Sequence, residues 1–379
     1  MGEKMKGLFK IMSILTLSVV VFSFFCVSVQ AFDSNIDQYN QEFDLSSVVS
    51  ATDDDALAIL KELGIDELSY ESLFNVSPVK VFEALFNILA RSVKAPLKFL
   101  FMSMGVLILT SLLSSFFDNS ETVSLVGCSI VALNCALPVA GMVSSAFSVL
   151  STLSIFTTSF AGVFCAIASS SGNISGGLMY SAMTVFSDTL FSGLLSELCR
   201  PVVSLMCCLS FLSCFDFYGF CAGLCSAFKK VYVFFMSFIG TVFSGIITIK
   251  GVLSDGADTV TARSIRFVVG RSLPVVGGTV SETYSALISS LSIIKNTVGI
   301  FGIITVIVTV LPTLAELLSW ILAIDIALVL CSSFGAHKVK PMLSVLKDTL
   351  ILLVATIVIV AAIFIVSVGV VITVRGGAV

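Results

Sequence analysis

Charged side chains are scarce in this sequence. Only 12% of its 379 residues are charged, whereas 57% are hydrophobic, and soluble domains carry about a quarter charged residues. A chain so poor in charge cannot cover a water-facing surface with it, so we expect most of the surface to face lipid. The net charge of −4 also lacks the basic footprint of proteins that bind nucleic acid. Nucleic acid is therefore not an expected partner.

The motifs of common catalytic and metal sites are also missing. The chain has one histidine, His337, and no C-x-x-C pair among its eleven cysteines, which makes a zinc site improbable. Phosphate-binding loops, dinucleotide fingerprints, nucleophile elbows and zinc-protease motifs do not occur either. We therefore expect no enzyme, no catalytic residue, no cofactor and no metal. The cysteines are interpreted as small apolar side chains, and any ATP hydrolysis is expected in another subunit.

The N-terminus has the pattern of an export signal. Lys4, Lys6 and Lys10 precede the apolar run 11–29, and Ala31 provides a small residue at the expected cleavage point. This pattern predicts a signal peptide over residues 1–31. An uncleaved signal anchor stays open as an alternative, because the apolar run is longer than usual. Either form places residue 33 onward outside the cytoplasm.

An acidic arm follows over residues 32–76. It holds eleven acidic residues against one base, Lys61. A short helix is expected near Thr52, where three aspartates would favour a helix N-terminus. The arm is interpreted either as a solvated linker or as a docking surface for a basic partner.

The rest of the chain predicts an all-α integral membrane protein, a polytopic helix bundle of seven to nine spans. Residues 77–96 have amphipathic helical spacing and are expected to lie along the membrane surface. Apolar runs then mark a first transmembrane bundle over 97–249 and a second over 297–379, joined by an amphipathic connection over 250–296. The apolar runs lie at 97–117, 122–143, 145–170, 178–195, 201–220, 231–249, 297–318, 319–335 and 349–374.

Small and ionisable residues suggest how these helices pack. Gly219 and Gly223, and Gly162 and Ala166, are spaced for close helix contact. Ionisable residues at membrane depth are costly and mark candidate sites, foremost Glu316 and Asp325. Their separation of nine residues places them on opposite faces of one helix unless the helix breaks between them. We therefore expect a structural or interfacial role in preference to a shared ion site.

The connection over 250–296 carries the most specific residues. Arg271-Ser-Leu-Pro274-Val-Val-Gly277-Gly278 is followed by Glu282 and then by a second motif, which is Lys295-Asn296-Thr297-Val298-Gly299. Pro274 can fix a bend, and the paired glycines allow tight backbone geometry. Arg271 could pair with Glu282 if the chain folds back between them. The pattern is interpreted as a structural turn without a ligand.

These motifs resemble the signature segment of the stage III sporulation protein AE family. The order of leader, acidic arm, basic amphipathic helix and final span fits the same family along the mature chain. The resemblance implies an integral-membrane platform or channel component of the complex that links mother cell and forespore, required after engulfment. It also implies a location in the mother-cell membrane around the forespore. The implied partners are ATPase, ring-forming and other membrane subunits of the stage III sporulation A complex, the lipid bilayer and, indirectly, a forespore-side partner.

An independent secondary transporter or permease is the alternative. That class predicts inverted repeats with interrupted helices around a midplane site. No convincing repeat relates residues 97–220 to residues 231–374, which favours the platform.

Overall fold

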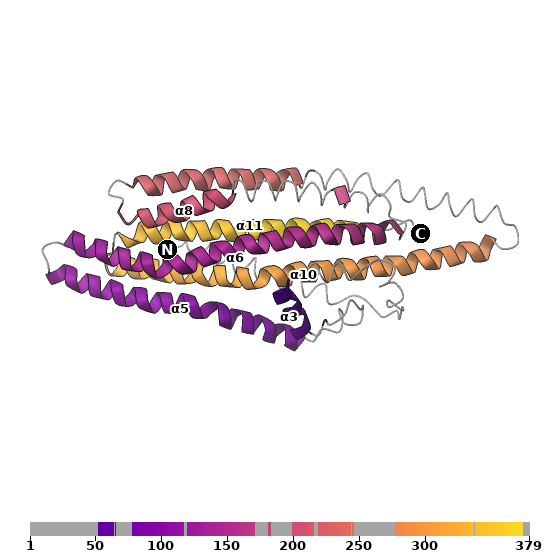
Figure 1. The fold of residues 1–379 in the computed structure, drawn as a ribbon, viewed down its shortest axis with the longest axis horizontal. Coiled ribbons are helices and arrows are strands. Elements are labelled where there is room, and N and C mark those ends of the chain that lie inside the picture. Colours follow the sequence, from indigo (N-terminus) through magenta and orange to yellow (C-terminus); the bar gives the residue numbers. More distant parts are fainter. Residues whose placement is uncertain are drawn as a thin grey trace.

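The fold is an elongated bundle of long helices (Figure 1). The computed structural model describes residues 52–63, 65, 78–116, 120–170, 181–182, 199–215, 219–243, 245, 277–336 and 338–373. These residues hold no β-strand. The helices are α3 (Asp54–Glu62), α5 (Pro78–Phe116), α6 (Ser120–Ser170), α8 (Arg200–Leu212), the unlabelled helix Phe220–Phe243, α10 (Gly277–Ser333) and α11 (Val339–Thr373). The predicted class of helical membrane protein is confirmed.

Fewer helices can span a membrane than the sequence suggested. Among the described residues, five helices are long and apolar enough to cross: α5, α6, the helix Phe220–Phe243, α10 and α11. The count is lower than the predicted seven to nine partly because neighbouring apolar runs join into single helices, and partly because run 201–220 forms only the 13-residue helix α8. Runs 122–143 and 145–170 form α6, and runs 297–318 and 319–335 belong to α10. The runs at 178–195 and 231–249 extend outside the described residues.

Prolines do not end these helices. α5 continues through Pro96, α6 through Pro138 and α10 through Pro312. The amphipathic segment over 77–96 and the first predicted span therefore form one helix, with no break between them. α10 is also continuous from Leu318 to Trp320, so Glu316 and Asp325 do not converge.

Several helices are longer than a bilayer is thick. At about 1.5 Å per residue, the 57 residues of α10 and the 51 residues of α6 extend for roughly 85 and 76 Å. The hydrocarbon of a bilayer is about 30 Å thick, and a tilted helix needs only slightly more length to cross it. Part of each helix therefore extends beyond the hydrocarbon.

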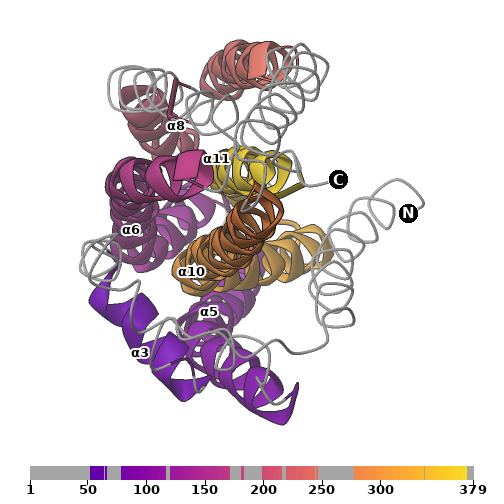
Figure 2. The same cartoon turned by 90° about the vertical axis from the view of Figure 1, so that its right-hand side faces the viewer.

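α10 and α11 form an antiparallel hairpin in the centre of the bundle. In the end-on view, α5, α6 and α8 surround this pair (Figure 2). The hairpin turn follows Ser333, and its Gly335 has a φ of +68°, a conformation that only glycine adopts without strain. The Ala336 N–H donates to the carbonyl of Cys331 at 3.0 Å, which closes the end of α10 as helix C-caps commonly do.

Aromatic side chains fill the contacts between these helices. Phe160 of α6 packs against Phe156 and Phe164 on its own helix and edge-on against Phe364 of α11, with a centroid distance of 5.5 Å. The single tryptophan, Trp320 of α10, is fully buried against Phe99 of α5. Burial of such rings supplies much of the packing energy of a helical core.

The N-terminal arm contributes a packed helix to the bundle. α3 buries Ala56 and Leu60 against α10 and α5, and acidic residues occupy its first turn. The helix expected near Thr52 is thus present, although Asp53 and not Thr52 occupies its N-cap. This part of the arm is docked on the bundle and is not a free linker.

Candidate functional site

Lys295 is the most unusual charged residue of the bundle. Its side chain is only 1% exposed, whereas lysine is almost never fully buried in proteins. The ammonium donates to the carbonyl oxygen of Ile372, 3.5 Å away in the last turn of α11. The carbonyls at a helix C-terminus lack partners inside their own helix, and a cation there is stabilised by the helix dipole. Lys295 of α10 therefore holds the end of α11.

Two glycines beside Lys295 allow the three central helices to approach closely. A Cβ at Gly299 would lie 2.5 Å from Cδ1 of Ile372, and a Cβ at Gly302 would lie 2.6 Å from the ring of Phe160. Real Cβ contacts are essentially never this short, so a larger residue at either position would force the facing side chain to move. Gly299 was predicted from its motif. Gly302 was missed, although the spacing Gly299-x-x-Gly302 indicates one helix face.

Ion pairs connect α11 to two of its neighbours at a second point. Lys347 pairs with Asp325 of α10, and the adjacent Asp348 pairs with Lys229 of the helix Phe220–Phe243 at 2.7 Å. All four side chains are partly shielded from solvent. Asp325 was expected to have a structural role, and its partner lies on another helix, where sequence spacing does not reveal it.

A buried hydrogen bond supports the same contact. The hydroxyl of Tyr232 lies 2.5 Å from that of Thr356 on α11, two turns along from the ion pair. Interhelical polar contacts of this kind stabilise membrane bundles by roughly 1 kcal/mol each. One ion pair and one buried hydrogen bond therefore link the helix Phe220–Phe243 to α11.

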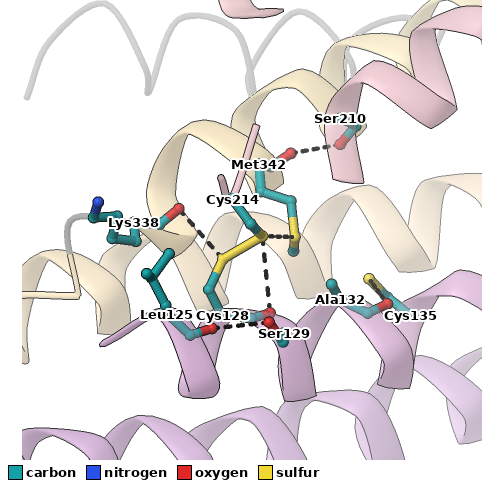
Figure 3. Close-up of a disulfide and its surroundings, with 9 residues drawn as sticks. All are labelled: Leu125, Cys128, Ser129, Ala132, Cys135, Ser210, Cys214, Lys338 and Met342. Carbon is teal, nitrogen blue, oxygen red and sulfur yellow. Dashed lines mark hydrogen bonds between the residues drawn. A yellow bond between two sulfur atoms is a disulfide. The ribbon is translucent and has the colours of Figure 1, made fainter. Parts of the chain in front are cut away.

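A disulfide joins Cys128 of α6 to Cys214, just after α8 (Figure 3). Both cysteines are fully buried. Beside the bond, the Ser210 hydroxyl donates to the carbonyl of Met342 at 2.8 Å, which fastens α8 to α11. The interpretation of every cysteine as a free apolar side chain is wrong for this pair. Its partners lie 86 residues apart, and local spacing gives no signal for such a bond.

The other predicted packing glycines have open surroundings. In the described part of the chain, no atom lies within 4 Å of a Cβ built at Gly162, Gly219 or Gly223, apart from the chain neighbours and the local helix backbone. Gly162 and Ala166 lie on the exposed face of α6. Gly219 has a φ of +71° at the start of the helix Phe220–Phe243, where the left-handed conformation favours glycine. These residues do not pack helices together within the described part of the chain.

The predicted turn around Pro274 lies partly outside the described residues. Arg271 and Pro274 belong to that part, so the pairing of Arg271 with Glu282 stays a prediction. Gly277 and Gly278 form the first turn of α10, and Glu282 lies in the next turns.

Glu316 and Asn296 have no partner within the part of the chain that the structure describes. Glu316 is half-buried on α10 and makes no hydrogen bond or ion pair there. The carbonyl oxygen of the Asn296 side chain is buried without a hydrogen bond.

No group of three potential metal ligands occurs among the residues that the structure describes. The arrangement around Lys295, Gly299 and Gly302 positions helices.

Comparison with known proteins gives this bundle a family. The profile of the family described as stage III sporulation protein AE matches residues 63–375. The chain is 27% identical over 312 residues to the stage III sporulation protein AE of Bacillus subtilis (strain 168), covering 78% of this chain and 76% of that protein. No solved structure matches. The match covers α5, α6, α8, α10 and α11, together with the motif that ends at Gly278 and the motif that begins at Lys295. The chain belongs to the stage III sporulation protein AE family.

Proposed function

We propose that this protein is the integral-membrane platform of a sporulation complex that links mother cell and forespore, located in the mother-cell membrane around the forespore. It would hold the ATPase, ring-forming and other membrane subunits together, and with them a forespore-side partner. Its contribution would be required for forespore development after engulfment. Membership of the sporulation family is the observation that carries this proposal.

The architecture supports a platform. α10 and α11 are tied to their neighbours by ion pairs and by glycine-dependent packing, and a disulfide ties α6 to the end of α8. Such contacts favour one fixed arrangement of helices. α6 and α10, each more than twice as long as the hydrocarbon is thick, also provide surface beyond it, where soluble subunits can bind.

Deleting the gene tests the proposal. Vegetative growth should be normal, and development should stop after engulfment begins. The partner subunits should still be made but should no longer co-purify as one membrane complex. Wild-type spore yield, or an intact complex without this chain, would contradict the proposal. A growth defect on one nutrient would instead favour the transporter.

A further inference from the structure

Three bases on α5 form an exposed cluster that has no counter-ion among the described residues. Arg91, Lys94 and Lys98 follow the spacing i, i+3, i+7, which places them on one helix face, and all three are exposed. None makes an ion pair or hydrogen bond with any described residue. By contrast, Lys229, Lys338 and Lys347 each pair with a carboxylate. As far as the described residues go, the cluster is therefore open to an anion from outside the chain.

The surroundings of the cluster are apolar and equally exposed. Four large apolar side chains next to the cluster along α5 are 45–72% exposed, namely Phe86, Leu89, Leu97 and Phe101. Large apolar side chains in these numbers face lipid in a membrane protein. A helix with exposed bases beside an exposed apolar face is typical of the boundary between headgroups and acyl chains.

The charge on α5 stops at Lys98. Residues 99–116 contain no charged side chain, and their 18 residues extend for about 27 Å, close to the thickness of the hydrocarbon. Along this stretch Leu109 and Phe116 are 60% and 83% exposed. Arg91, Lys94 and Lys98 thus lie within about 10 Å of the end of this lipid-facing stretch. At that distance their long side chains can reach the lipid headgroups.

Two neighbouring helices change their outer surface at the same level. Phe99 of α5 touches Trp320 of α10, with ring centroids 5.2 Å apart, so these two residues are at the same level. α10 has no exposed residue from 291 to 321. Just beyond Trp320 it exposes the apolar side chains of Leu322 and Val329. On α6 large apolar side chains are exposed up to Leu137, and the exposed residues beyond it are small or polar except Ile155.

The antiparallel packing of α6 on α10 relates these positions. Leu137 precedes Phe160 by 23 residues, and Asp325 follows Gly302 by 23 residues. Because Phe160 contacts Gly302, Leu137 is level with Asp325, close to Leu322. α5, α6 and α10 therefore mark one boundary, and the ion pair of Asp325 lies at the same level.

We infer that Arg91, Lys94 and Lys98 form a binding site for the phosphate headgroup of anionic phospholipids. Three donors on one face can share a headgroup phosphate, and an anionic lipid supplies the missing negative charge. Each base near a membrane surface strengthens such binding by about fivefold. Loss of all three is expected to weaken it by roughly 100-fold.

Lipid binding to the full-length chain in neutral detergent tests the inference. Phosphatidylglycerol and phosphatidylcholine are titrated separately, and bound lipid is counted by native mass spectrometry. The cluster variant is R91Q/K94Q/K98Q. The charge-matched control is K61Q/K230Q/K340Q, which removes three exposed bases elsewhere. Thermal unfolding confirms that both variants fold.

We expect the wild type and the control to retain phosphatidylglycerol in preference to phosphatidylcholine, and the cluster variant to lose that preference. Equal losses in the two variants would show a general charge effect and overturn the site. So would unchanged binding in the cluster variant. If that variant retains phosphatidylglycerol but loses a co-purifying acidic subunit, the surface binds a protein and the inference is wrong.

Discussion

Single residues decide how closely the central helices approach, and Gly302 gives the sharpest test. Gly302→Val should lower the unfolding free energy by about 1–3 kcal/mol, because an added side chain overpacks a filled contact against Phe160. Gly162→Val is the matched control, since a Cβ there meets open space. Thermal unfolding of the two variants in detergent measures the difference. Equal midpoints would show that Phe160 can move aside.

Lys295 allows function to be separated from stability. Replacing a buried charge with an apolar side chain of similar volume is often neutral or stabilising, so Lys295→Met should accumulate in the membrane and unfold no more easily than the wild type. Spore yield should nevertheless fall, because a buried lysine is retained at a cost and marks a candidate functional position. Lys230→Met, at an exposed position, should sporulate normally. Full spore yield from Lys295→Met would limit the residue to a packing role.

Sequence reasoning reached these residues unevenly. Lys295, Asn296 and Gly299 were found because they form a contiguous motif. Gly302 and the pair Cys128–Cys214 were missed because their importance depends on a partner far away in the chain. Gly162 has a spacing typical of packing but faces outward, because small residues on a helix do not specify which face is covered.

At the scale of helices, polar contacts hold α11 to its neighbours. Asp325→Lys should destabilise the bundle by about 1–3 kcal/mol, since it replaces a charge-assisted hydrogen bond with two like charges. Adding Lys347→Asp should restore most of the loss by rebuilding the pair in reverse. Unfolding midpoints in detergent measure both steps. A double variant no better than the single one would show that the pairing itself does not stabilise the bundle.

The pair Glu121–Lys338 is a matched control for that experiment. Glu121 is 65% exposed, and exposed ion pairs contribute only about 0–1 kcal/mol. The same reversal at these positions should therefore change the midpoint little. A large effect there would mean that charge reversal acts on the bundle in some other way.

The helices themselves were predicted better than their ends. Apolar runs located nearly every described helix, because backbone groups inside lipid must be satisfied within a helix. The runs did not reveal that α6 and α10 are continuous. Pro96, Pro138 and Pro312 were natural points to divide the chain, yet neighbouring helices and local backbone adjustments let a membrane helix continue through proline.

At the scale of the whole molecule, the direction of α5 links the N-terminal arm to the opposite end of the bundle. α5 begins beside the arm and ends near the α10–α11 turn (Figure 1). If α5 crosses the membrane once, the arm and this turn lie on opposite sides. The leader predicts that the arm lies outside, which places the turn at Gly335 in the cytoplasm.

Cysteine labelling in intact protoplasts decides this orientation. A cysteine introduced at Glu62, an exposed residue of α3, should react with an impermeant maleimide. One introduced at Ser333, an exposed residue beside the turn, should react only after the membrane is opened.

This orientation puts the disulfide Cys128–Cys214 near the cytoplasmic end, where accessible disulfides are reduced. Both cysteines are fully buried, so a disulfide formed there is shielded from thiols until the chain unfolds. Labelling at Ser333 but not at Glu62 would reverse the orientation and place the disulfide on the oxidising side.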